Sequence, residues 1–398
     1  MAEYKAAVIG LGRMGSTFDD EMESGGTLFK PYCHGPTYYY SDRVELVAGA
    51  DPHDGQRELF GDRWGLNSAN LYSDYREMIE KEKPDIVSVC TTPRLRSGIV
   101  QDLVKGGVKG IWAEKPITLT LEAADEMVQA CKESGVALAI NCARRYMHGY
   151  SEARAIIESG DLGDVLQVTS HFPCGLSSNG SHLIDTIRYL AGGEVKWVFG
   201  EIESDEAAAS DIDPYGNGYL GFDSGARAFL RSMYSGDTGI HQFHVICERG
   251  EIICDESPPS FQLIKQGTDA PYGENFHQGT AKLSGPRPVS YPLPLPPQVE
   301  GTGITVLNDL IEAMETGRPP RCSGEDGLKA LEIGIAIRES HRRGGVKVDL
   351  PLNDRSLMIM SSETIGDDIP KRVRREQGTL PMPGSKSTGA EQHRSYSA

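Results

Sequence analysis

The chain has 398 residues, and its 57 acidic side chains outnumber its 40 Lys and Arg residues, which gives a formal net charge of −17. Phosphate binding needs a basic surface, so this balance argues against nucleic acid as the main partner. No apolar run approaches the roughly 18 residues of a membrane span. Eight scattered cysteines without a C-x-x-C pair indicate a reduced, cytoplasmic protein without a metal site.

The first predicted element is a short strand that starts at residue 4 and ends in a glycine-rich turn. Three glycines have the G-x-G-x-x-G spacing: Gly10, Gly12 and Gly15. The first allows a sharp turn, the second leaves room for a pyrophosphate, and the third lets the next helix pack closely with its N–H groups aimed at the phosphates. We therefore predict a dinucleotide site here, with Arg13 and Met14 of the same turn beside the cofactor.

The next predicted strand, residues 44–50, ends at Asp51. An acidic residue there can bind the adenosine ribose hydroxyls and repel a 2′-phosphate, which favours NAD over NADP. Asp51 lies 36 positions after Gly15, against about 20 in the usual motif. The excess falls in residues 17–36, which we interpret either as an insertion over the cofactor or substrate cleft or as a surface loop.

Two further buried strands end in residues that bear chemistry. Thr91, Thr92 and Pro93 follow the strand at 85–90, and Glu114 and Lys115 follow the apolar segment at 108–113. Ligands of open α/β sheets bind beyond the carboxyl ends of the strands. All five residues are therefore predicted to line the cofactor site, although a solvated charged pair is the ordinary interpretation of Glu-Lys elsewhere in a protein.

From residue 165 the pattern changes to strands in direct succession. They are expected at 165–172, 197–203, 219–222, 226–232, 239–248 and 250–253. Consecutive strands favour a mostly antiparallel sheet. We predict an α/β fold class, with a Rossmann domain of parallel strands at 1–140 and a C-terminal α+β domain with a mostly antiparallel open sheet at 141–350.

The last third of the chain contains two predicted amphipathic helices, at 305–316 and 327–342. The proline-rich residues 284–301 are expected to form a loop or a crossing segment. The polar tail, 369–398, is expected to be disordered.

The motifs G-L-G-R-M-G and A-E-K-P together resemble those of the Gfo/Idh/MocA family of NAD(P)-dependent sugar and cyclitol oxidoreductases. Four later segments are similar to family segments in the same order: 141–146, 156–165, 180–190 and 324–339. The resemblance implies NAD as cofactor, a small carbohydrate as substrate, and a homodimer or homotetramer associated through the exposed face of the second sheet.

The resemblance also assigns roles to single residues. Lys115 matches the family's active-site lysine and His182 its general base, a role that suits the near-neutral pKa of imidazole. Asp185, one helical turn after His182, matches a position that often binds substrate hydroxyls. Arg145 and His171 are further candidates for substrate binding, and an interdomain contact and a packing role are the alternatives for them.

Two positions depart from the family pattern. Ser178 stands where the family commonly has an aspartate, four residues before His182, and Ser97 stands where it often has a histidine. A serine cannot balance the charge of Lys115. Arg94 and Arg96 flank this second departure, and we consider two roles for them: binding an acidic substrate, or remaining solvated at a helix start.

The sequence therefore predicts an NAD-dependent oxidation of a secondary hydroxyl of a sugar, sugar acid or cyclitol. Lys115 would orient the substrate, and His182 would act as general base. Two alternatives stay open: an NAD-dependent lyase or glycosidase that oxidises its substrate transiently, and a cofactor-sensing regulator without catalysis.

Overall fold

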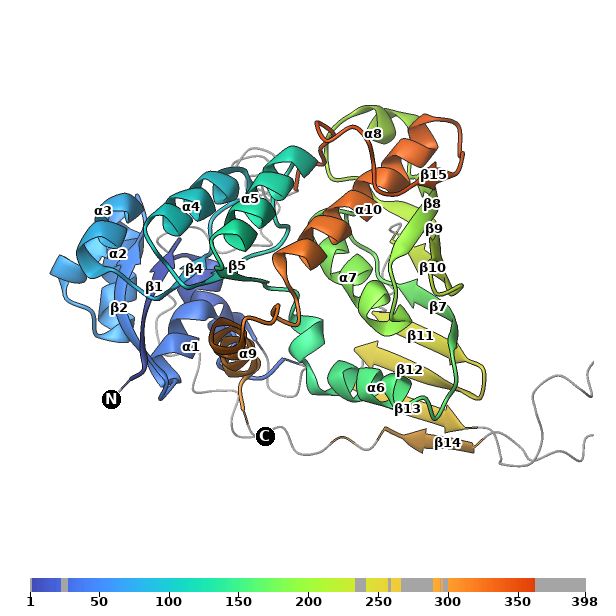
Figure 1. Cartoon of the computed structure of the whole chain (residues 1–398), viewed down its shortest axis with the longest axis horizontal. Coiled ribbons are helices and arrows are strands. Elements are labelled where there is room, and N and C mark those ends of the chain that lie inside the picture. Colours follow the sequence, from blue (N-terminus) through green and yellow to red (C-terminus); the bar gives the residue numbers. More distant parts are fainter. Residues whose placement is uncertain are drawn as a thin grey trace, which may run out of the picture.

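Two β-sheets, one parallel and one mostly antiparallel, organise the chain (Figure 1). The computed structural model describes residues 2–22, 28–232, 241–256, 259–265, 289–293, 295 and 300–361. The expected disorder of 369–398 therefore lies outside the described residues. Within them, no helix combines the length and the hydropathy that a crossing of the bilayer requires.

The first sheet has six strands in the order β3-β2-β1-β4-β5-β6, all parallel. They are β1 (Tyr4–Ile9), β2 (Val44–Ala50), β3 (Leu71–Tyr72), β4 (Ile86–Val89), β5 (Gly110–Ala113) and β6 (Ala137–Ile140). Every residue of β4 and β5 is buried, as expected for central parallel strands that helices cover on both faces. The predicted Rossmann sheet is confirmed.

Helices connect these strands and cover both faces of the sheet (Figure 1). They are α1 (His34–Tyr40), α2 (Asp54–Trp64), α3 (Tyr75–Glu82), α4 (Pro93–Lys105) and α5 (Leu121–Glu133). The chain leaves β1 toward β2 on one side and reaches β4 on the other side. This change of direction creates a crevice at the carboxyl ends of the strands, which is where ligands of such sheets bind.

The segment between the glycine turn and α1 replaces the usual continuous helix. A five-residue helical turn, Arg13–Thr17, is followed by a second short turn, Phe18–Glu21, before α1 begins at His34. The buried carboxylate of Asp19 accepts hydrogen bonds from the backbone N–H groups of Tyr32 and Cys33, which closes the base of this segment. Residues 23–27 of the predicted insertion lie outside the described residues.

The second sheet has nine strands in the order β14-β13-β12-β11-β7-β10-β9-β8-β15. They are β7 (Val165–His171), β8 (Val195–Ile202), β9 (Gly216–Phe222), β10 (Arg227–Arg231), β11 (Gln242–Cys247), β12 (Gly250–Glu256), β13 (Pro259–Lys265), β14 (Val289–Pro292) and β15 (Val348–Asp349). Strands β7 and β10 pair in parallel, and the other neighbours pair antiparallel. The predicted mostly antiparallel sheet is confirmed.

The prediction of a loop across 284–301 is wrong for its centre, because Val289–Pro292 forms the edge strand β14 against β13. Prolines next to a strand argue against a central position in a sheet. An edge strand tolerates them, since one side of its backbone makes no ladder bonds. All four residues of β14 are exposed, so they lack the apolar alternation that reveals a half-buried strand.

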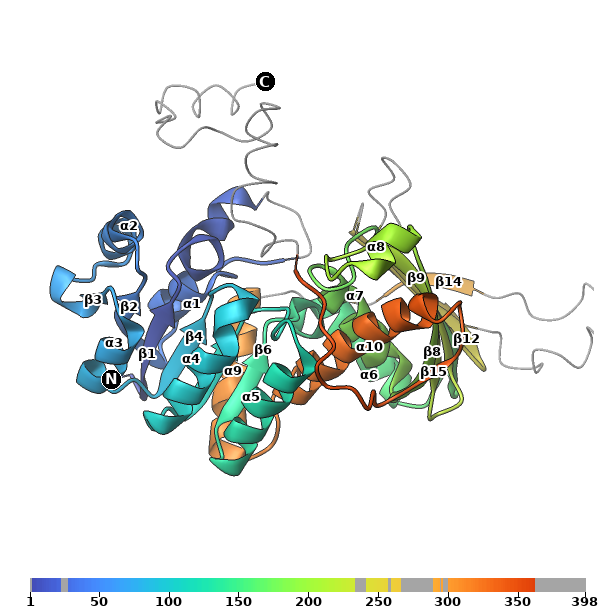
Figure 2. The same cartoon turned by 90° about the horizontal axis from the view of Figure 1, so that it is seen from above.

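In the described part of the chain, five α-helices follow the last strand of the parallel sheet, and the last two contact that sheet or its helix α5. The five are α6 (His148–Glu158), α7 (Gly180–Ala191), α8 (Asp205–Ala209), α9 (Thr302–Thr316) and α10 (Gly324–Arg342). The long helix α10 lies between the sheets (Figure 1 and Figure 2) and packs against α7 and β8 on one side and α5 on the other. Helix α9 returns to the parallel sheet and packs on β5 and β6. The carboxyl edge of that sheet therefore faces α7.

Candidate active site

The glycine turn after β1 has the geometry of a phosphate cradle. Gly10 has a φ of +87°, and a Cβ there would come within 2.9 Å of the Cys90 backbone. A Cβ at Gly15 would collide with the carbonyl oxygen of Gly10. At Gly12, by contrast, no described atom lies within 4 Å of the Cβ position. The fold therefore needs the first and third glycines, whereas the space at the second is left for a ligand.

Asp51 fixes this turn from the end of β2. Its Oδ2 accepts the Leu11 backbone N–H at 2.9 Å, and its Oδ1 accepts the His53 N–H at 3.0 Å. The Asp51 carboxylate is only 9% exposed, yet it borders the turn where the adenosine ribose is expected. Arg57 donates a hydrogen bond to the Asp51 carbonyl oxygen. Its guanidinium also forms an ion pair with the carboxylate of Asp54.

The other residues predicted from the glycine turn are more open. Arg13 makes a two-pronged contact with Glu21, with both distances 2.7 Å, and its guanidinium lies over the Phe18 ring. Met14 is half-buried. A cofactor phosphate at Arg13 would compete with Glu21 for this guanidinium.

Arg96 joins the loops that end β4 and β5. Its guanidinium donates to the carbonyl oxygens of Thr91 and Pro116, and the side chain is 1% exposed. Neither predicted role, substrate binding or a solvated position, is therefore correct for Arg96. The buried cation instead satisfies two backbone carbonyls beside the predicted cofactor residues Thr92 and Pro93. Arg94, two residues earlier on α4, is exposed, as expected for a solvated arginine.

Glu114 is buried beneath the same edge. Its Oε1 lies 3.2 Å from His34 Nε2 and accepts a hydrogen bond from Asn141 Nδ2 at 2.6 Å, while its Oε2 accepts the Lys115 N–H at 3.2 Å. Burial alone would raise the pKa of this carboxyl, but His34, Lys115 and Asn141 outweigh burial and lower it. Glu114 is therefore ionised at neutral pH. Its carboxylate faces the interior and holds the backbone of Lys115.

The charge of Lys115, which follows β5 of the parallel sheet, reaches His182 on helix α7. Lys115 Nζ donates to Asn179 Oδ1 at 3.3 Å, and Asn179 immediately precedes α7, whose third residue is His182. Burial, followed by the charges of Lys115 and Arg144, lowers the pKa of His182 well below its ordinary value. His182 is therefore neutral at pH 7, the state that a general base requires. Its Nδ1 is buried and has no hydrogen-bond partner among the described residues.

The loop before α7 contains Ser178, the residue at the position where the family commonly has an aspartate. Ser178 is nearly buried, and its backbone N–H donates to Asp213 Oδ2 at 2.9 Å. The Ser177 N–H donates to the other oxygen of Asp213 at 2.6 Å. Asp213 thus holds the backbone of this loop, and the side chain that reaches Lys115 is the neutral amide of Asn179.

Asp185 and Arg145 face one another inside the protein. Asp185 is completely buried, and Arg145 contacts both of its oxygens at 2.7 to 3.1 Å. Arg145 also pairs with Asp326 of α10 at 3.0 Å. A substrate hydroxyl would have to compete with Arg145 for the Asp185 carboxylate. Substrate binding by these two residues therefore requires a rearrangement of a buried ion pair.

Arg144, the neighbour of Arg145, was not singled out by the sequence motifs. It lies in the short turn Ala143–Tyr146, contacts Glu256 of β12 at 2.7 and 2.8 Å, and sits 4.7 Å above the Phe172 ring. Its charge reaches His182, as the lowered pKa shows. The two adjacent arginines in the sequence could have drawn attention to this turn. The sequence does not indicate, however, that Arg144 contacts β12 while Arg145 contacts α7.

His171 ends β7 beside Arg231 of β10, with 3.2 Å between His171 Nδ1 and the guanidinium. Burial and the charge of Arg231 lower the pKa of His171. Its Nε2 is buried without a hydrogen-bond partner among the described residues. His171 is thus neutral at pH 7, and substrate binding by this residue stays a prediction.

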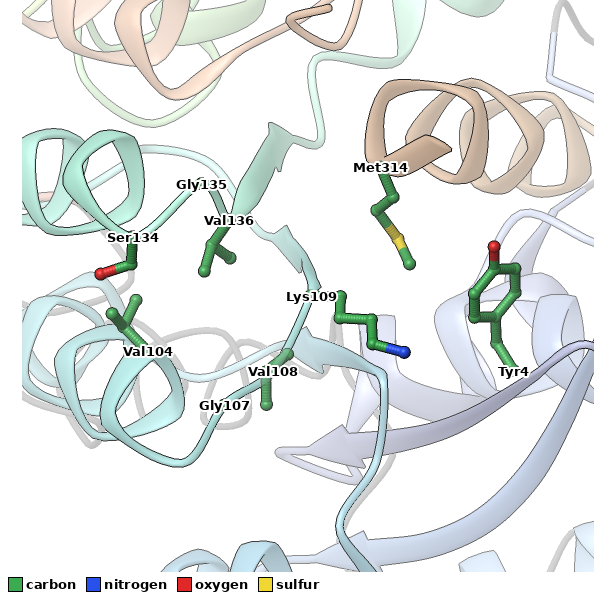
Figure 3. A pocket seen from close by; sticks show the side chains of 9 residues that line it. All are labelled: Tyr4, Val104, Gly107, Val108, Lys109, Ser134, Gly135, Val136 and Met314. Carbon is green, nitrogen blue, oxygen red and sulfur yellow. The ribbon is translucent and has the colours of Figure 1, made fainter. Parts of the chain in front are cut away.

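A pocket lies at the opposite edge of the parallel sheet (Figure 3). It is lined by Tyr4 at the start of β1, by Lys109 and Val136 just before β5 and β6, and by Met314 of α9. Figure 3 shows Lys109 directed toward Tyr4, whose ring centroid is 6.0 Å from its Nζ. Because cofactors of this fold bind at the carboxyl ends of the strands, the pocket does not belong to the site around Lys115.

The geometry of the glycine turn predicts that Gly12→Val abolishes dinucleotide binding while the protein stays folded. The added side chain meets no described atom of the protein but fills the space of the pyrophosphate. Gly15→Val is the matched control, since its side chain collides with the Gly10 backbone and should lower the melting temperature. Cofactor titration by fluorescence, with thermal denaturation of both variants, provides the measurement. Full affinity in folded Gly12→Val would show that the turn binds no phosphate.

Comparison with known proteins matches both halves of the chain. Residues 4–142 match the family described as "Oxidoreductase family, NAD-binding Rossmann fold", and residues 150–253 match the GFO/IDH/MocA C-terminal domain. A myo-inositol 2-dehydrogenase from Thermotoga maritima is 26% identical over 84% of this chain and 96% of its own length. The scyllo-inositol 2-dehydrogenase (NAD(+)) of Bacillus subtilis is 24% identical over 86% of this chain and 95% of its own.

Solved structures share the fold. An aldose-aldose oxidoreductase from Caulobacter crescentus, complexed with glycerol, superposes with a TM-score of 0.69 at 24% identity, over 87% of this chain and 100% of its own. An inositol dehydrogenase homologue from Azotobacter vinelandii, complexed with NADH and myo-inositol, gives a TM-score of 0.68 at 18% identity, over 87% and 98% of the two chains. With both domain matches in sequence order, the chain belongs to the Gfo/Idh/MocA family of NAD-binding oxidoreductases.

Proposed function

We propose that the protein oxidises a secondary hydroxyl of a sugar, sugar acid or cyclitol with NAD, Lys115 orienting the substrate and His182 accepting the proton. The observation that carries the proposal is that a neutral imidazole, whose Nδ1 has no hydrogen-bond partner among the described residues, lies within the electrostatic influence of a lysine at the carboxyl edge of the Rossmann sheet. Relatives described as inositol and apiose dehydrogenases support the carbohydrate class.

The residues at this edge can perform the required steps. Lys115 Nζ uses one of its three donors on Asn179, so two remain for the substrate oxygen. The neutral imidazole of His182 takes the hydroxyl proton as the carbon–oxygen bond gains double-bond character. NAD, when bound along Gly10–Gly15 and Asp51, supplies the hydride acceptor. Glu114 positions Lys115 by accepting a hydrogen bond from the backbone N–H of Lys115.

His182→Ala should lose at least about a hundredfold in turnover, because general bases contribute about 10²–10⁴-fold. NAD affinity and thermal stability should stay close to those of the parent protein. Lys115→Ala should also lose turnover. His244→Ala is the matched control, since His244 lies on β11 and pairs with Glu251. NADH formation on the accepted substrate provides the measurement. Near-parental turnover of His182→Ala would move the base to another residue, such as Asp185 or His171.

We also infer a preference for NAD over NADP from Asp51, whose charge beside the adenosine ribose repels a 2′-phosphate. Asp51→Asn removes the charge and keeps an oxygen that can accept the Leu11 N–H, so it should narrow the preference without loosening the turn. Asp51→Ala should also narrow the preference for NAD, and it should weaken the binding of both cofactors. Fluorescence titration of each variant with NAD and NADP measures the ratio of the two dissociation constants. Tighter binding of NADP by the parent protein would contradict the inference.

A homodimer or homotetramer is the third part of the proposal, and the outer face of the second sheet supports it. Four aromatic residues point away from the helices there: Trp197, Phe199, Tyr219 and Phe229. Tyr219 stacks on Phe229 at 4.7 Å and meets Trp197 at 5.4 Å between ring centroids. Such an apolar ladder on an open sheet favours burial against a second copy.

Phe229→Glu should therefore shift the protein toward the monomer, because it places a charge at the β10 end of this ladder, directly against Tyr219. Leu59→Glu on α2 is a matched control, with an exposure of 43% against 44% for Phe229. Light scattering at micromolar concentration measures the mass of each variant. A monomer mass for the parent protein would contradict the proposed assembly.

A further inference from the structure

We infer that the substrate carries a carboxylate, and that the neutral amide of Asn179 leaves the charge of Lys115 available to bind it. This inference rests on the proposed function and narrows its substrate class from carbohydrates in general to sugar acids.

Lys115 has an amide where a carboxylate would neutralise it. Its Nζ donates to Asn179 Oδ1 at 3.3 Å. Across the part of the chain that the structure describes, no carboxylate oxygen lies within 4.0 Å of this nitrogen. Ser178, the residue at the position where the family commonly has an aspartate, provides only a hydroxyl. The ammonium group therefore enters the reaction with its full positive charge.

The carboxylates of the neighbourhood are engaged elsewhere. Each accepts hydrogen bonds from at least two groups: Glu114 from Asn141 and His34, Glu256 from Arg144 and Tyr150, and Asp213 from the backbone of Ser177 and Ser178. Glu114 is also nearly buried, as is the side chain of Glu256. The charge of Lys115 helps to lower the pKa of Glu114, but within the described residues none of these three carboxylates forms an ion pair with Lys115 Nζ, which keeps donors for an anion.

The electrostatic field at His182 has the same sign. The two charged side chains that lower its pKa, Lys115 and Arg144, are both cations. His182 also lies in the first turn of α7, a helix of 12 residues, where the dipole adds positive potential. A substrate anion bound beside His182 would gain attraction from all three sources. It would also make the imidazole a stronger base when the hydroxyl proton leaves.

A carboxylate matches this environment better than a phosphate. Arg144 is paired with Glu256 through two hydrogen bonds, so of the two cations near His182 only Lys115 lacks an ion-pair partner in the described structure. A single negative charge balances it, whereas a phosphate monoester brings nearly two. The chemistry common to both groups is an oxyanion, and a test has to separate the two.

The test compares sugars that differ only at carbon 6. Full-length protein with NAD is assayed for NADH formation with D-glucose, D-glucuronate and D-glucose 6-phosphate, and with the same three forms of D-galactose. We expect at least one acid to exceed its neutral sugar by about tenfold in kcat/KM, mostly through KM, which is the size of one partly screened charge contact. The preference should fall with added salt.

Two variants of Asn179 test the origin of the preference. Asn179→Asp puts a carboxylate of the same size against Lys115 and should remove most of the ratio between acid and neutral sugar. Asn179→Ser removes the amide without adding charge and should keep the ratio. NAD titration and thermal denaturation of both variants verify that the fold and the cofactor site are intact. An unchanged ratio in Asn179→Asp would overturn the inference.

Failure of this inference is distinguishable from failure of the proposed function. Equal or better oxidation of the neutral sugars overturns the inference and leaves the dehydrogenase intact. If no sugar yields NADH, thermal stabilisation of the NAD-loaded protein reports binding. If a sugar acid stabilises the parent protein but not Asn179→Asp, the result supports the inference and contradicts net oxidation. If no sugar acid stabilises the parent protein, the inference is overturned. A preference for the 6-phosphate supports an oxyanion site and assigns it to phosphate.

Discussion

An ionised carboxylate inside the protein is the constraint on which the rest of the site depends. A buried charge has to be compensated by hydrogen bonds. For Glu114 the donors come from three separate elements: His34 at the start of α1, Asn141 after β6, and the backbone of Lys115. The carboxylate therefore locks the helix after the unusual insertion to the edge of the sheet that presents the lysine.

The protonation of this network follows from its geometry. Burial lowers the pKa of His34, so its ring is neutral and carries one proton. With that proton on Nε2 facing Glu114, Nδ1 accepts from the Ser88 hydroxyl at 2.8 Å, and Ser88 accepts from Tyr38 at 2.7 Å. Because the pKa values of both His34 and Glu114 are lowered by folding, acid protonates the unfolded chain first. The network's contribution to stability is present at neutral pH and is lost as the pH falls through 6.5 and then through 4.5.

Local sequence motifs predicted the elements that carry their own signal. The glycine spacing located the turn after β1, where Gly10 has a positive φ and a Cβ at Gly15 would collide with the Gly10 carbonyl oxygen. Lys115 was placed because strand ends in a parallel sheet share one edge, and the resemblance to a family added His182. The contacts that complete the site were not predictable in this way. Arg96 reaches Pro116, 20 residues further on, and Arg144 and Asp213 find their partners 112 and 36 residues away. Two adjacent arginines look alike in the sequence, although Arg144 pairs with strand β12 and Arg145 with helix α7.

Helix α9 carries a consequence for how the chain is made. It is encoded more than 150 residues after β6, yet it packs on β5 and β6 as part of the covering of the first sheet. During synthesis the nucleotide-binding half leaves the ribosome with this apolar face of its sheet bare, and it waits for almost the whole of the second sheet to emerge. The two halves are therefore not separable modules. An excised N-terminal fragment would expose the surface that α9 covers, and chaperones would meet that same surface on the nascent chain.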